Sequence, residues 1–313
     1  MRRRVRDALL AAVLVFSAAG AFAQGFPSKP VRIVVPFPPG GGADTLARIM
    51  EPELAGIWQQ TIVVENRPGA SGHIGADFVA KSVPDGHTLL MSSTASLTEK
   101  NLSQFAPVSL VSASAYVVTA NPGVAAADIR GLIALAKANP GKISFGSSGT
   151  GAASHLSAEL FKSMAGVDLL HVPYKGTGQA LTDLLAGHVN LMFAPAQTVM
   201  PYVRAGKLKA LAATGARRSE TLQDLPTVAE SGLPGYEAVG WFGLLAPAAT
   251  PKETVAKLSA EANRVLAMSE VREKMRVLGA EPAGNTPEEF ARFIRGDQAK
   301  WSKLMKEAGI TPE

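Results

Sequence analysis

The sequence predicts an α/β protein built from two lobes, with C-terminal helices packing back on the first lobe. Short β-branched runs alternate with amphipathic helical stretches, and this alternation is typical of parallel sheets covered by helices. A strand, a glycine-rich loop and a helix follow one another twice, once in each predicted lobe. The 313 residues include 47% hydrophobic residues and no cysteine, so each lobe can form a core that needs no disulfide.

The N-terminus predicts export. Four arginines among residues 2–6 precede an apolar run over residues 8–16, and Ala21-Phe22-Ala23 matches an A-x-A cleavage site. We expect residues 1–23 to be a cleavable signal peptide, too short to span a membrane. Cleavage would remove those arginines and Asp7, lowering the formal net charge from +5 to about +2. We therefore expect no nucleic-acid partner and, because a lipoprotein signal ends at a cysteine, no lipid anchor.

Residues 24–120 are predicted to form the first part of lobe 1. Val31–Val35 is a β-branched run, and a loop rich in proline and glycine follows it over residues 37–42. Asp44 then opens an amphipathic helix. The later elements are strands over residues 61–65, 88–91 and 116–119 and a helix after residue 74.

Residues 121–239 are predicted to form lobe 2. A helix over residues 129–138 precedes the second unit, which consists of a strand over 142–145, a loop over 146–151 and a helix over 154–164. The later elements of this lobe are strands over residues 169–172, 189–193 and 208–214 and a helix over 181–186. Residues 240–313 return to lobe 1 with a strand over 241–246 and helices over 251–268 and 287–308.

Common catalytic motifs are missing from the sequence. The five histidines are scattered singly, without the H-E-x-x-H spacing that places two metal ligands on one helical face. The serine motif G-x-S-x-G fails at Ser148 and Ser71, because Thr150 and His73 stand at the last glycine position. The phosphate-loop and dinucleotide-binding patterns are incomplete as well. The sequence therefore predicts no metal, no cofactor and no enzyme of these classes.

The two glycine-rich loops are the strongest candidates for a binding site. Each loop leaves a strand and enters a helix, where free backbone N–H groups and the helix dipole attract an anion. Neither loop contains arginine or lysine, so a carboxylate suits them better than a phosphate. The alternative is that both loops are simply tight turns. Two such loops in separate lobes favour a ligand between the lobes.

Several side chains in these loops allow two interpretations. Asp44 either faces the ligand or caps the helix by accepting from its first N–H groups. Ser147, Ser148 and Thr150 either donate to a carboxylate or cap their own helix.

Four segments resemble one known family. They are Phe37-Pro38-Pro39-Gly40-Gly41-Gly42-Ala43-Asp44, Glu65-Asn66-Arg67-Pro68-Gly69-Ala70-Ser71-Gly72, His171-Val172-Pro173-Tyr174-Lys175-Gly176, and Leu225-Pro226-Thr227-Val228-Ala229-Glu230-Ser231-Gly232 with Pro234-Gly235-Tyr236-Glu237. Their order and content resemble the Bug (Bordetella uptake gene) family, the periplasmic substrate-binding proteins of tripartite tricarboxylate transporters. The resemblance implies a two-lobed periplasmic binding protein of the Venus-flytrap type, type II-like, with one ligand in its cleft.

The resemblance also implies which residues bind the ligand. Two loops of the family clamp one ligand carboxylate, and three further segments face the cleft. To these we add Phe193. Phe193 and Trp241 could both line the cleft, but the alternative is that both belong to the core, as aromatic residues in apolar strands often do. The predicted ligand-binding residues are Phe37, Pro39, Gly40, Gly41, Ala43, Asp44, Ser71, Gly72, Ser92, Thr94, Ser147, Gly149, Thr150, Tyr174, Gly176 and Phe193.

We expect the protein to capture a small carboxylate in the periplasm and deliver it to membrane transporter subunits. The ligand classes left open are di- and tricarboxylates, aromatic acids and amino acids, and the protein is expected to act as a monomer. One alternative is a sensor that presents the same ligand to a receptor ectodomain. Another is a secreted enzyme with Asp44, Asp183 or His155 as its base.

Overall fold

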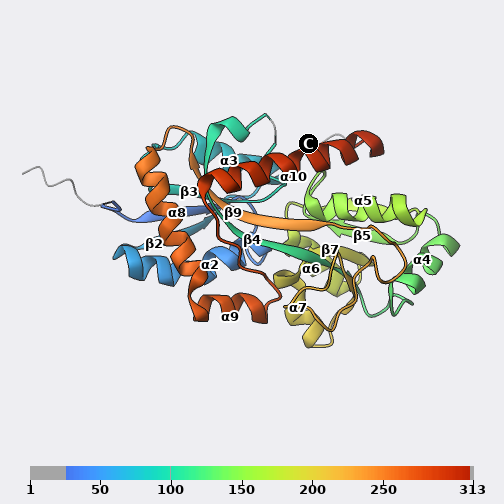
Figure 1. The fold of residues 1–313 in the computed structure, drawn as a ribbon. Coiled ribbons are helices and arrows are strands. Elements are labelled where there is room, and N and C mark those ends of the chain that lie inside the picture. Colours follow the sequence, from blue (N-terminus) through green and yellow to red (C-terminus); the bar gives the residue numbers. More distant parts are fainter. Residues whose placement is uncertain (1–25, 99, 311–313) are drawn as a thin grey trace, which may run out of the picture.

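The computed structural model describes residues 26–98 and 100–310, so the predicted signal peptide lies outside the described residues. Two lobes lie side by side, and strands β4 (Phe105–Ala120) and β9 (Val239–Pro247) run between them while helix α10 (Pro287–Ala308) lies across both (Figure 1). Within the described part of the chain, no helix is both long and apolar enough to cross a membrane.

The sheet of the first lobe has the order β2-β1-β3-β9-β4. Strand β1 (Val31–Val35) pairs in parallel with β2 (Ile62–Asn66) and β3 (Thr88–Ser92), whereas β9 pairs antiparallel to β3. Alternate residues of β1 enter different cores, since Ile33 packs with one helix layer and Val34 with the other. This alternation follows from the two-residue period of a strand.

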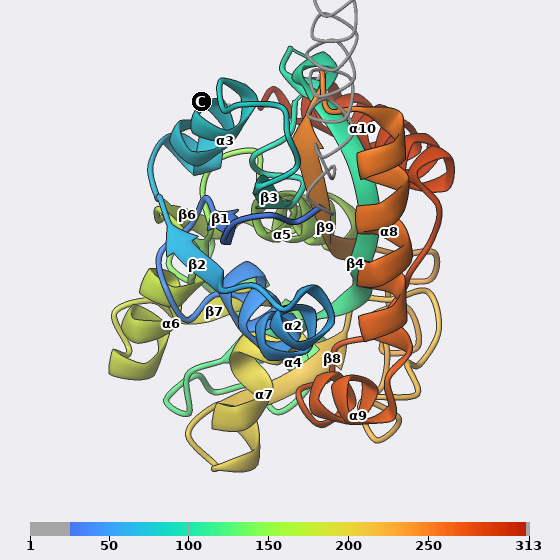
Figure 2. The same cartoon turned by 90° about the vertical axis from the view of Figure 1, so that its left-hand side faces the viewer.

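Helices cover both faces of that sheet. Helices α2 (Gly42–Trp58), α8 (Lys252–Ala267) and α9 (Ser269–Val277) supply buried side chains to one core, and α3 (His73–Ala80) supplies them to the other. Figure 2 shows α2 and α3 on opposite sides of β1 and β2. Two single 3₁₀ turns, Ala70–Gly72 and Leu102–Gln104, complete the described elements of this lobe.

The sheet of the second lobe continues from the far end of β4. Strand β7 (Leu191–Pro195) pairs with β4 on one side and β5 (Ser144–Ser147) on the other, and β6 (Leu170–Pro173) forms the outer edge. Strand β8 (Lys209–Ala213) pairs with the other edge of β4. The covering helices are α4 (Ile129–Ala138) and α5 (Ala153–Ala165) in one core and α6 (Thr177–Ala186) and α7 (Ala196–Arg204) in the other.

Strand β4 is much longer than the predicted strand over residues 116–119. Its first two thirds pair with β9 and its last residues pair with β7 and β8, so it belongs to both lobes. Buried serines in this part, among them Ser109 and Ser112, interrupt the apolar pattern that marks a strand in the sequence. Ser109 Oγ donates to Asn263 Oδ1 over 2.5 Å, which satisfies the hydroxyl inside the protein.

Helix α10 connects the two lobes. Phe290 and Ile294 lie in the core of the first lobe, as the predicted packing of the C-terminal helices requires. Trp301, two turns further along, lies in the core of the second lobe with Leu156 and Phe161. The C-terminal half of α10 therefore packs where the sequence did not lead us to expect it.

Candidate functional site

Three helices from the two lobes begin around one small hollow, which we call the inner hollow. Helix α2 of the first lobe begins at Gly42, and α6 and α7 of the second lobe begin at Thr177 and Ala196. The hollow has a volume of about 20 Å³ and is lined by Phe37, Gly41, Gly42, Ala43, Ser93, Tyr116, Ser148, Thr177, Pro195 and Phe242. The first N–H groups of a helix have no partner within it, so these ends favour an anion.

The two lobes are in close contact beside the inner hollow. A side chain at Gly41 would place its Cβ atom 2.9 Å from Thr177 Oγ1 of the other lobe. A side chain at Gly178 would place its Cβ atom 2.7 Å from the carbonyl oxygen of Pro39. A cavity of this volume holds about one water molecule. The lobes therefore touch beside the inner hollow, which is too small to hold an organic acid while they do so.

Asp44 holds the first glycine loop in place. Its Oδ2 accepts from the Gly40 N–H at 3.0 Å, and its Oδ1 accepts from Arg48 Nε and Asn66 Nδ2, each at 3.0 Å. Burial alone would raise the pKa of Asp44, but the hydrogen bonds from Arg48, Gly40 and Asn66 outweigh it and keep that pKa below its usual value. The cap interpretation of Asp44 is wrong, because the helix begins at Gly42 with Gly41 as its N-cap and no side chain caps it.

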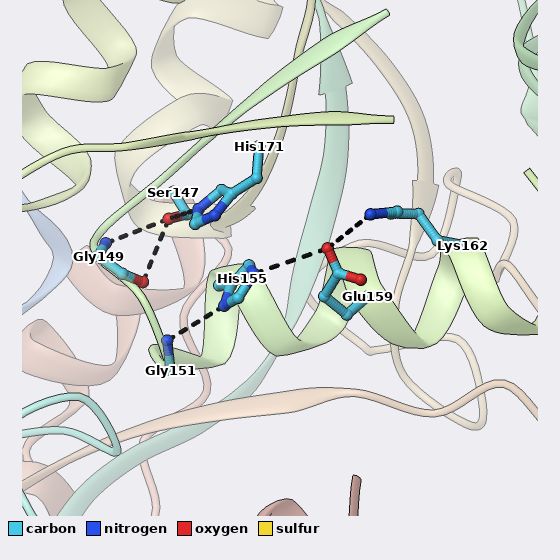
Figure 3. A network of polar contacts seen from close by, with 7 residues as sticks. All are labelled: Ser147, Gly149, Gly151, His155, Glu159, Lys162 and His171. Carbon is cyan, nitrogen blue, oxygen red and sulfur yellow. Dashed lines mark hydrogen bonds and ion pairs between the residues drawn. The ribbon is translucent and has the colours of Figure 1, made fainter. Parts of the chain in front are cut away.

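The second glycine loop is held by a pair of stacked histidines, drawn in Figure 3. The rings of His155 and His171 are 3.9 Å apart and 13° from parallel. His155 Nδ1 accepts from the Gly151 N–H at 3.1 Å, and His171 Nε2 lies 2.6 Å from Ser147 Oγ. The same hydroxyl accepts from the Gly149 N–H at 3.2 Å. Ser147 is fully buried, so it positions the loop from behind.

Burial also affects the protonation of His171. Desolvation, followed by the nearby His155, lowers the pKa of His171 to about 4. His171 is therefore neutral at pH 7. On the far side of His155, Glu159 Oε1 lies 3.6 Å from the ring and 2.9 Å from Lys162 Nζ.

A second and larger hollow opens between the lobes beneath α10, and we call it the outer pocket. Its volume is about 660 Å³. Ser71, Thr94 and Thr150 line it together with residues of α10. It lies next to the inner hollow, because Ser93 and Ser148, close to Thr94 and Thr150 in the chain, line the inner one.

The structure brings together many of the sixteen predicted residues. Phe37, Gly41 and Ala43 line the inner hollow, and Ser71, Thr94 and Thr150 line the outer pocket. Four more lie in loops beside the contact between the lobes. Pro39, Gly149 and Gly176 lie close to residues of the other lobe, and Gly40 belongs to the first glycine loop. Asp44, Gly72, Ser92 and Ser147 are buried behind these loops.

Two predicted residues lie away from both hollows. Tyr174 directs its hydroxyl to Asp183 Oδ2, 2.6 Å away, and this hydrogen bond ties a turn to α6. Phe193 is fully buried in the core of the second lobe, 5.5 Å from Phe161 between ring centroids. The core interpretation is therefore correct for Phe193. It is also correct for Trp241, which packs edge-on against Phe290.

Other lining residues were missed. Thr177 follows Gly176 at the start of a helix, and this is the signal that also marked the two glycine loops. Pro195 precedes α7, a helix that the sequence analysis did not predict. Tyr116 and Phe242 reach the inner hollow from β4 and β9. These strands are far apart in the sequence and lie side by side only through long-range pairing. No local pattern reveals such pairing.

The side chains around the hollows suit binding. Among the described residues, no group of three or more His, Asp or Glu is placed to hold a metal ion. The candidate bases lie elsewhere: Asp44 is held by three donors, His155 is stacked in the second lobe, and Asp183 bonds Tyr174. The described lining of the inner hollow combines glycines, four hydroxyl side chains and the apolar residues Phe37, Ala43, Pro195 and Phe242, with no acidic or basic side chain among them.

Comparison with known proteins identifies the family. A family model described as the tripartite tricarboxylate transporter family receptor matches residues 46–310. Rpa4515 of R. palustris, solved with adipate, is 35% identical, with a TM-score of 0.88 over 92% of this chain and 100% of that one. The periplasmic binding protein BugD is 37% identical, with a TM-score of 0.86 over 92% and 100%. MatC of Rhodopseudomonas palustris, solved with malate, is 32% identical, with a TM-score of 0.82 over 89% and 99%.

These neighbours are substrate-binding proteins and not enzymes, and their fold confirms the predicted two-lobed α/β architecture. The matched region begins at residue 46, within α2, and includes all of α5 and α10, whereas the first glycine loop lies just before it. The chain therefore belongs to the tripartite tricarboxylate transporter family receptors, the family of the Bug proteins.

Proposed function

We propose that this chain captures a small carboxylate between its two lobes and delivers it to a membrane transporter. The observation that carries the proposal is the convergence of the N-terminal ends of α2, α6 and α7 on one hollow between the lobes. Helices of both lobes contribute, so a bound carboxylate would hold the lobes together. The relatives solved with adipate and malate bind ligands of this class.

A carboxylate fits this site better than a phosphate does. The residues that line the inner hollow include serine, threonine and tyrosine hydroxyls but neither arginine nor lysine. Phosphate sites generally add such a cation to the backbone donors, because the second charge must be balanced. Backbone donors and hydroxyls alone suffice for one carboxylate group.

The cellular setting of the proposal is the periplasm. The family consists of periplasmic binding proteins, and the first 23 residues have the pattern of a cleavable signal. We propose lobe boundaries near residues 120 and 240, close to where the paired strands β4 and β9 pass from one lobe to the other, and a monomer as the working unit. A sensor that presents the same ligand to a receptor ectodomain is the second candidate. Pull-down of neighbouring membrane proteins with and without ligand distinguishes the two.

The proposal is tested by thermal unfolding in the presence of carboxylates. The panel contains di- and tricarboxylates, aromatic acids and amino acids at millimolar concentration, and the primary amides of the same compounds serve as controls. A ligand at 100 times its Kd stabilises the fold by about 2.7 kcal/mol, which raises the melting temperature by several degrees. We expect at least one acid to do so and its amide to have no effect. If no acid raises the melting temperature, the proposal is wrong.

A further inference from the structure

We propose that His155 makes ligand capture depend on pH, because a proton taken up by its ring breaks a hydrogen bond that fixes the second glycine loop. This inference rests on the proposed function and adds a control of the same site. His155 lies in the first turn of α5, directly after the loop, and is 4% exposed. Its ring faces Gly151 of the loop on one side and Glu159 on the other (Figure 3).

The hydrogen bond between the ring and the loop requires an unprotonated Nδ1 atom. His155 Nδ1 accepts from the Gly151 N–H at 3.1 Å. A charged histidine carries a proton on both ring nitrogens, so its Nδ1 is a donor and no longer an acceptor. Protonation therefore places two donors opposite each other at this distance, and the Gly151 N–H loses its partner. Either the loop or the ring must then move.

Of the two stacked histidines, His155 is the one that takes up the first proton. Burial, followed by the nearby His155, lowers the pKa of His171 to about 4, so the His171 ring stays neutral in mildly acidic solution. The two ring centroids are only 3.9 Å apart, and two positive charges at that separation repel each other strongly. In mildly acidic solution the pair therefore binds a single proton, on the ring that holds Gly151.

The charged groups next to the two rings lie on α5. Glu159 Oε1 lies 3.6 Å from His155 Nε2 and 2.9 Å from Lys162 Nζ. Burial alone would raise the pKa of Glu159, but its contacts with His155 and Lys162 outweigh it and keep that pKa below its usual value. The Glu159 carboxylate therefore stabilises a positive ring, whereas burial and the start of α5 oppose one.

The other elements around the two rings bring neutral groups to them. Among the described residues, Phe145 and Ser147 of β5 contact His171, and the loop contacts His155 through a backbone N–H. The titratable side chains across the outer pocket, which the loop also lines, are His73, Asp77, Lys100 and Lys306. Of these, only His73 ordinarily titrates between pH 5 and 8, so it is the competing source of a pH effect.

Loss of the hydrogen bond affects residues that border both hollows. Gly151 directly follows Thr150, which lines the outer pocket, and Ser148 lines the inner hollow. Ser148 Oγ stays 2.9 Å from Ser154 Oγ, so protonation loosens one half of the loop and leaves the other half held. A loosened loop must be ordered again when a carboxylate binds, which lowers affinity. Glu159 balances the charge of the ring, so attraction between that charge and the ligand is the smaller effect.

NMR of the protein without ligand tests the hydrogen bond itself. The Gly151 amide and the His155 ring are followed between pH 8 and 5, the range in which histidine titrates. We expect the Gly151 signal to shift with the same midpoint as the His155 ring. His155→Gln keeps a side-chain acceptor that does not titrate, and its Gly151 signal should stay constant. If the wild-type Gly151 signal does not shift, or shifts equally in His155→Gln, the inference is wrong.

Calorimetry tests the effect on capture, with adipate, malate and the acid of the panel that stabilises the fold most. We expect the wild type to bind about tenfold more weakly at pH 5.5 than at pH 7.5, the loss that one hydrogen bond can cause. In His155→Gln the loss should be less than about threefold, and titration of the acid itself is common to both proteins.

Two further histidine variants complete the experiment. His73→Gln removes the competing histidine, and His188→Gln removes one whose side chain is 71% exposed. Both should keep the full wild-type loss of affinity at low pH. A loss that is equal in His155→Gln, or that disappears in His73→Gln, would overturn this inference and leave the proposed function standing. If no acid of the panel binds at either pH, the proposed function is wrong and this inference falls with it.

Discussion

The carboxylate of Asp44 holds the first glycine loop through three hydrogen bonds. It is 4% exposed and joins the Gly40 N–H, the Arg48 guanidinium and the Asn66 amide. The Asn66 amide also donates to the carbonyl oxygen of Phe37, so both ends of the loop are bound to one polar cluster. The loop that borders the inner hollow is thereby fixed before a ligand arrives, which reduces the entropy lost on binding.

Replacing Asp44 should therefore affect both stability and affinity. Asp44→Ala removes the acceptor of the Gly40 N–H and one acceptor each of the Arg48 guanidinium and the Asn66 amide, and we expect a loss of about 1–3 kcal/mol in the free energy of unfolding. Carboxylate binding should weaken as well, because the loop is no longer held. Urea denaturation and calorimetry measure the two effects. Glu270→Ala is the control, since Glu270 forms an exposed helical pair with Lys274 and should change neither quantity measurably. Unchanged affinity in Asp44→Ala would show that the cluster does not shape the loop.

His171 should make stability depend on pH. Its pKa is lowered to about 4, chiefly by burial, whereas a histidine in the unfolded chain titrates near 6.5. The neutral ring therefore contributes its full stabilisation above pH 6.5, and this is lost as the pH falls toward 4, because the unfolded chain binds the proton first. We expect a loss of about 2 kcal/mol over this window, less than the full shift implies because the ring is only partly buried.

Denaturation between pH 4 and 7 measures this effect. His171→Gln removes the titrating ring and should flatten the pH dependence over that window, compared with the wild type. His188→Gln is the control, since the His188 side chain is 71% exposed. A pH dependence that is the same in all three proteins would show that protonation of His171 does not destabilise the second glycine loop.

At the scale of elements, the inner hollow depends on close approach of a loop and a helix start. Gly41 has a φ of −82°, which any residue can adopt, so a side chain there creates no strain within its own lobe. Its Cβ atom would instead meet Thr177 Oγ1 of the other lobe at 2.9 Å. Gly41→Val should therefore fold normally and fail to close on a ligand.

The expected result for Gly41→Val is at least a hundredfold loss of carboxylate affinity with a melting temperature, without ligand, close to that of the wild type. Calorimetry and thermal unfolding measure the two quantities. Gly296→Ala is the matched control, since a Cβ atom there meets nothing within 4 Å. If Gly41→Val binds the carboxylate normally, the first loop is not part of the site.

The sequence predicts those elements whose signals are local. Both glycine loops, strand β1 and helices α4 and α10 were predicted with nearly the observed bounds, because turn residues and periodicity mark them directly. Helix α7 was missed because it is short and contains two unfavourable prolines. Pro195 stands at its N-cap and Pro201 lies inside it, and both suggest a loop in the sequence. Helix α9 was missed because it is short and mostly charged. Tyr116 and Phe242 line the inner hollow because β4 and β9 pair with each other, and only the three-dimensional structure reveals this pairing.

At the scale of the whole molecule, Asp297 links the elements that cross between the lobes. It accepts from Trp241 Nε1 at 2.7 Å, Trp301 Nε1 at 2.8 Å and Thr94 Oγ1 at 3.2 Å. These partners come from β9, from the part of α10 packed on the second lobe, and from the lining of the outer pocket. Burial raises the pKa of Asp297, and its three donors only partly oppose this. Asp297 thus connects β9 and the C-terminal half of α10 to Thr94 in the lining of the outer pocket.

Asp297→Ala should weaken this link. Two buried indole N–H groups would lose their acceptor, and we expect the free energy of unfolding to fall by about 2–4 kcal/mol. The fluorescence spectrum should change as well, because two of the three tryptophans are involved. Chemical denaturation followed by fluorescence measures both, with Lys303→Ala on the exposed side of α10 as the control. An unchanged midpoint would show that the link does not stabilise the fold.

We propose above all that backbone donors of both lobes hold a ligand carboxylate in the cleft. The most direct measurement is a crystal structure of the protein with the acid that raises its melting temperature most. We predict the ligand between the lobes, with one carboxylate within 2.7–3.2 Å of backbone N–H groups from the two glycine loops or the start of α6. A ligand bound outside the cleft, or a carboxylate held only by lysine or arginine side chains, would contradict the claim.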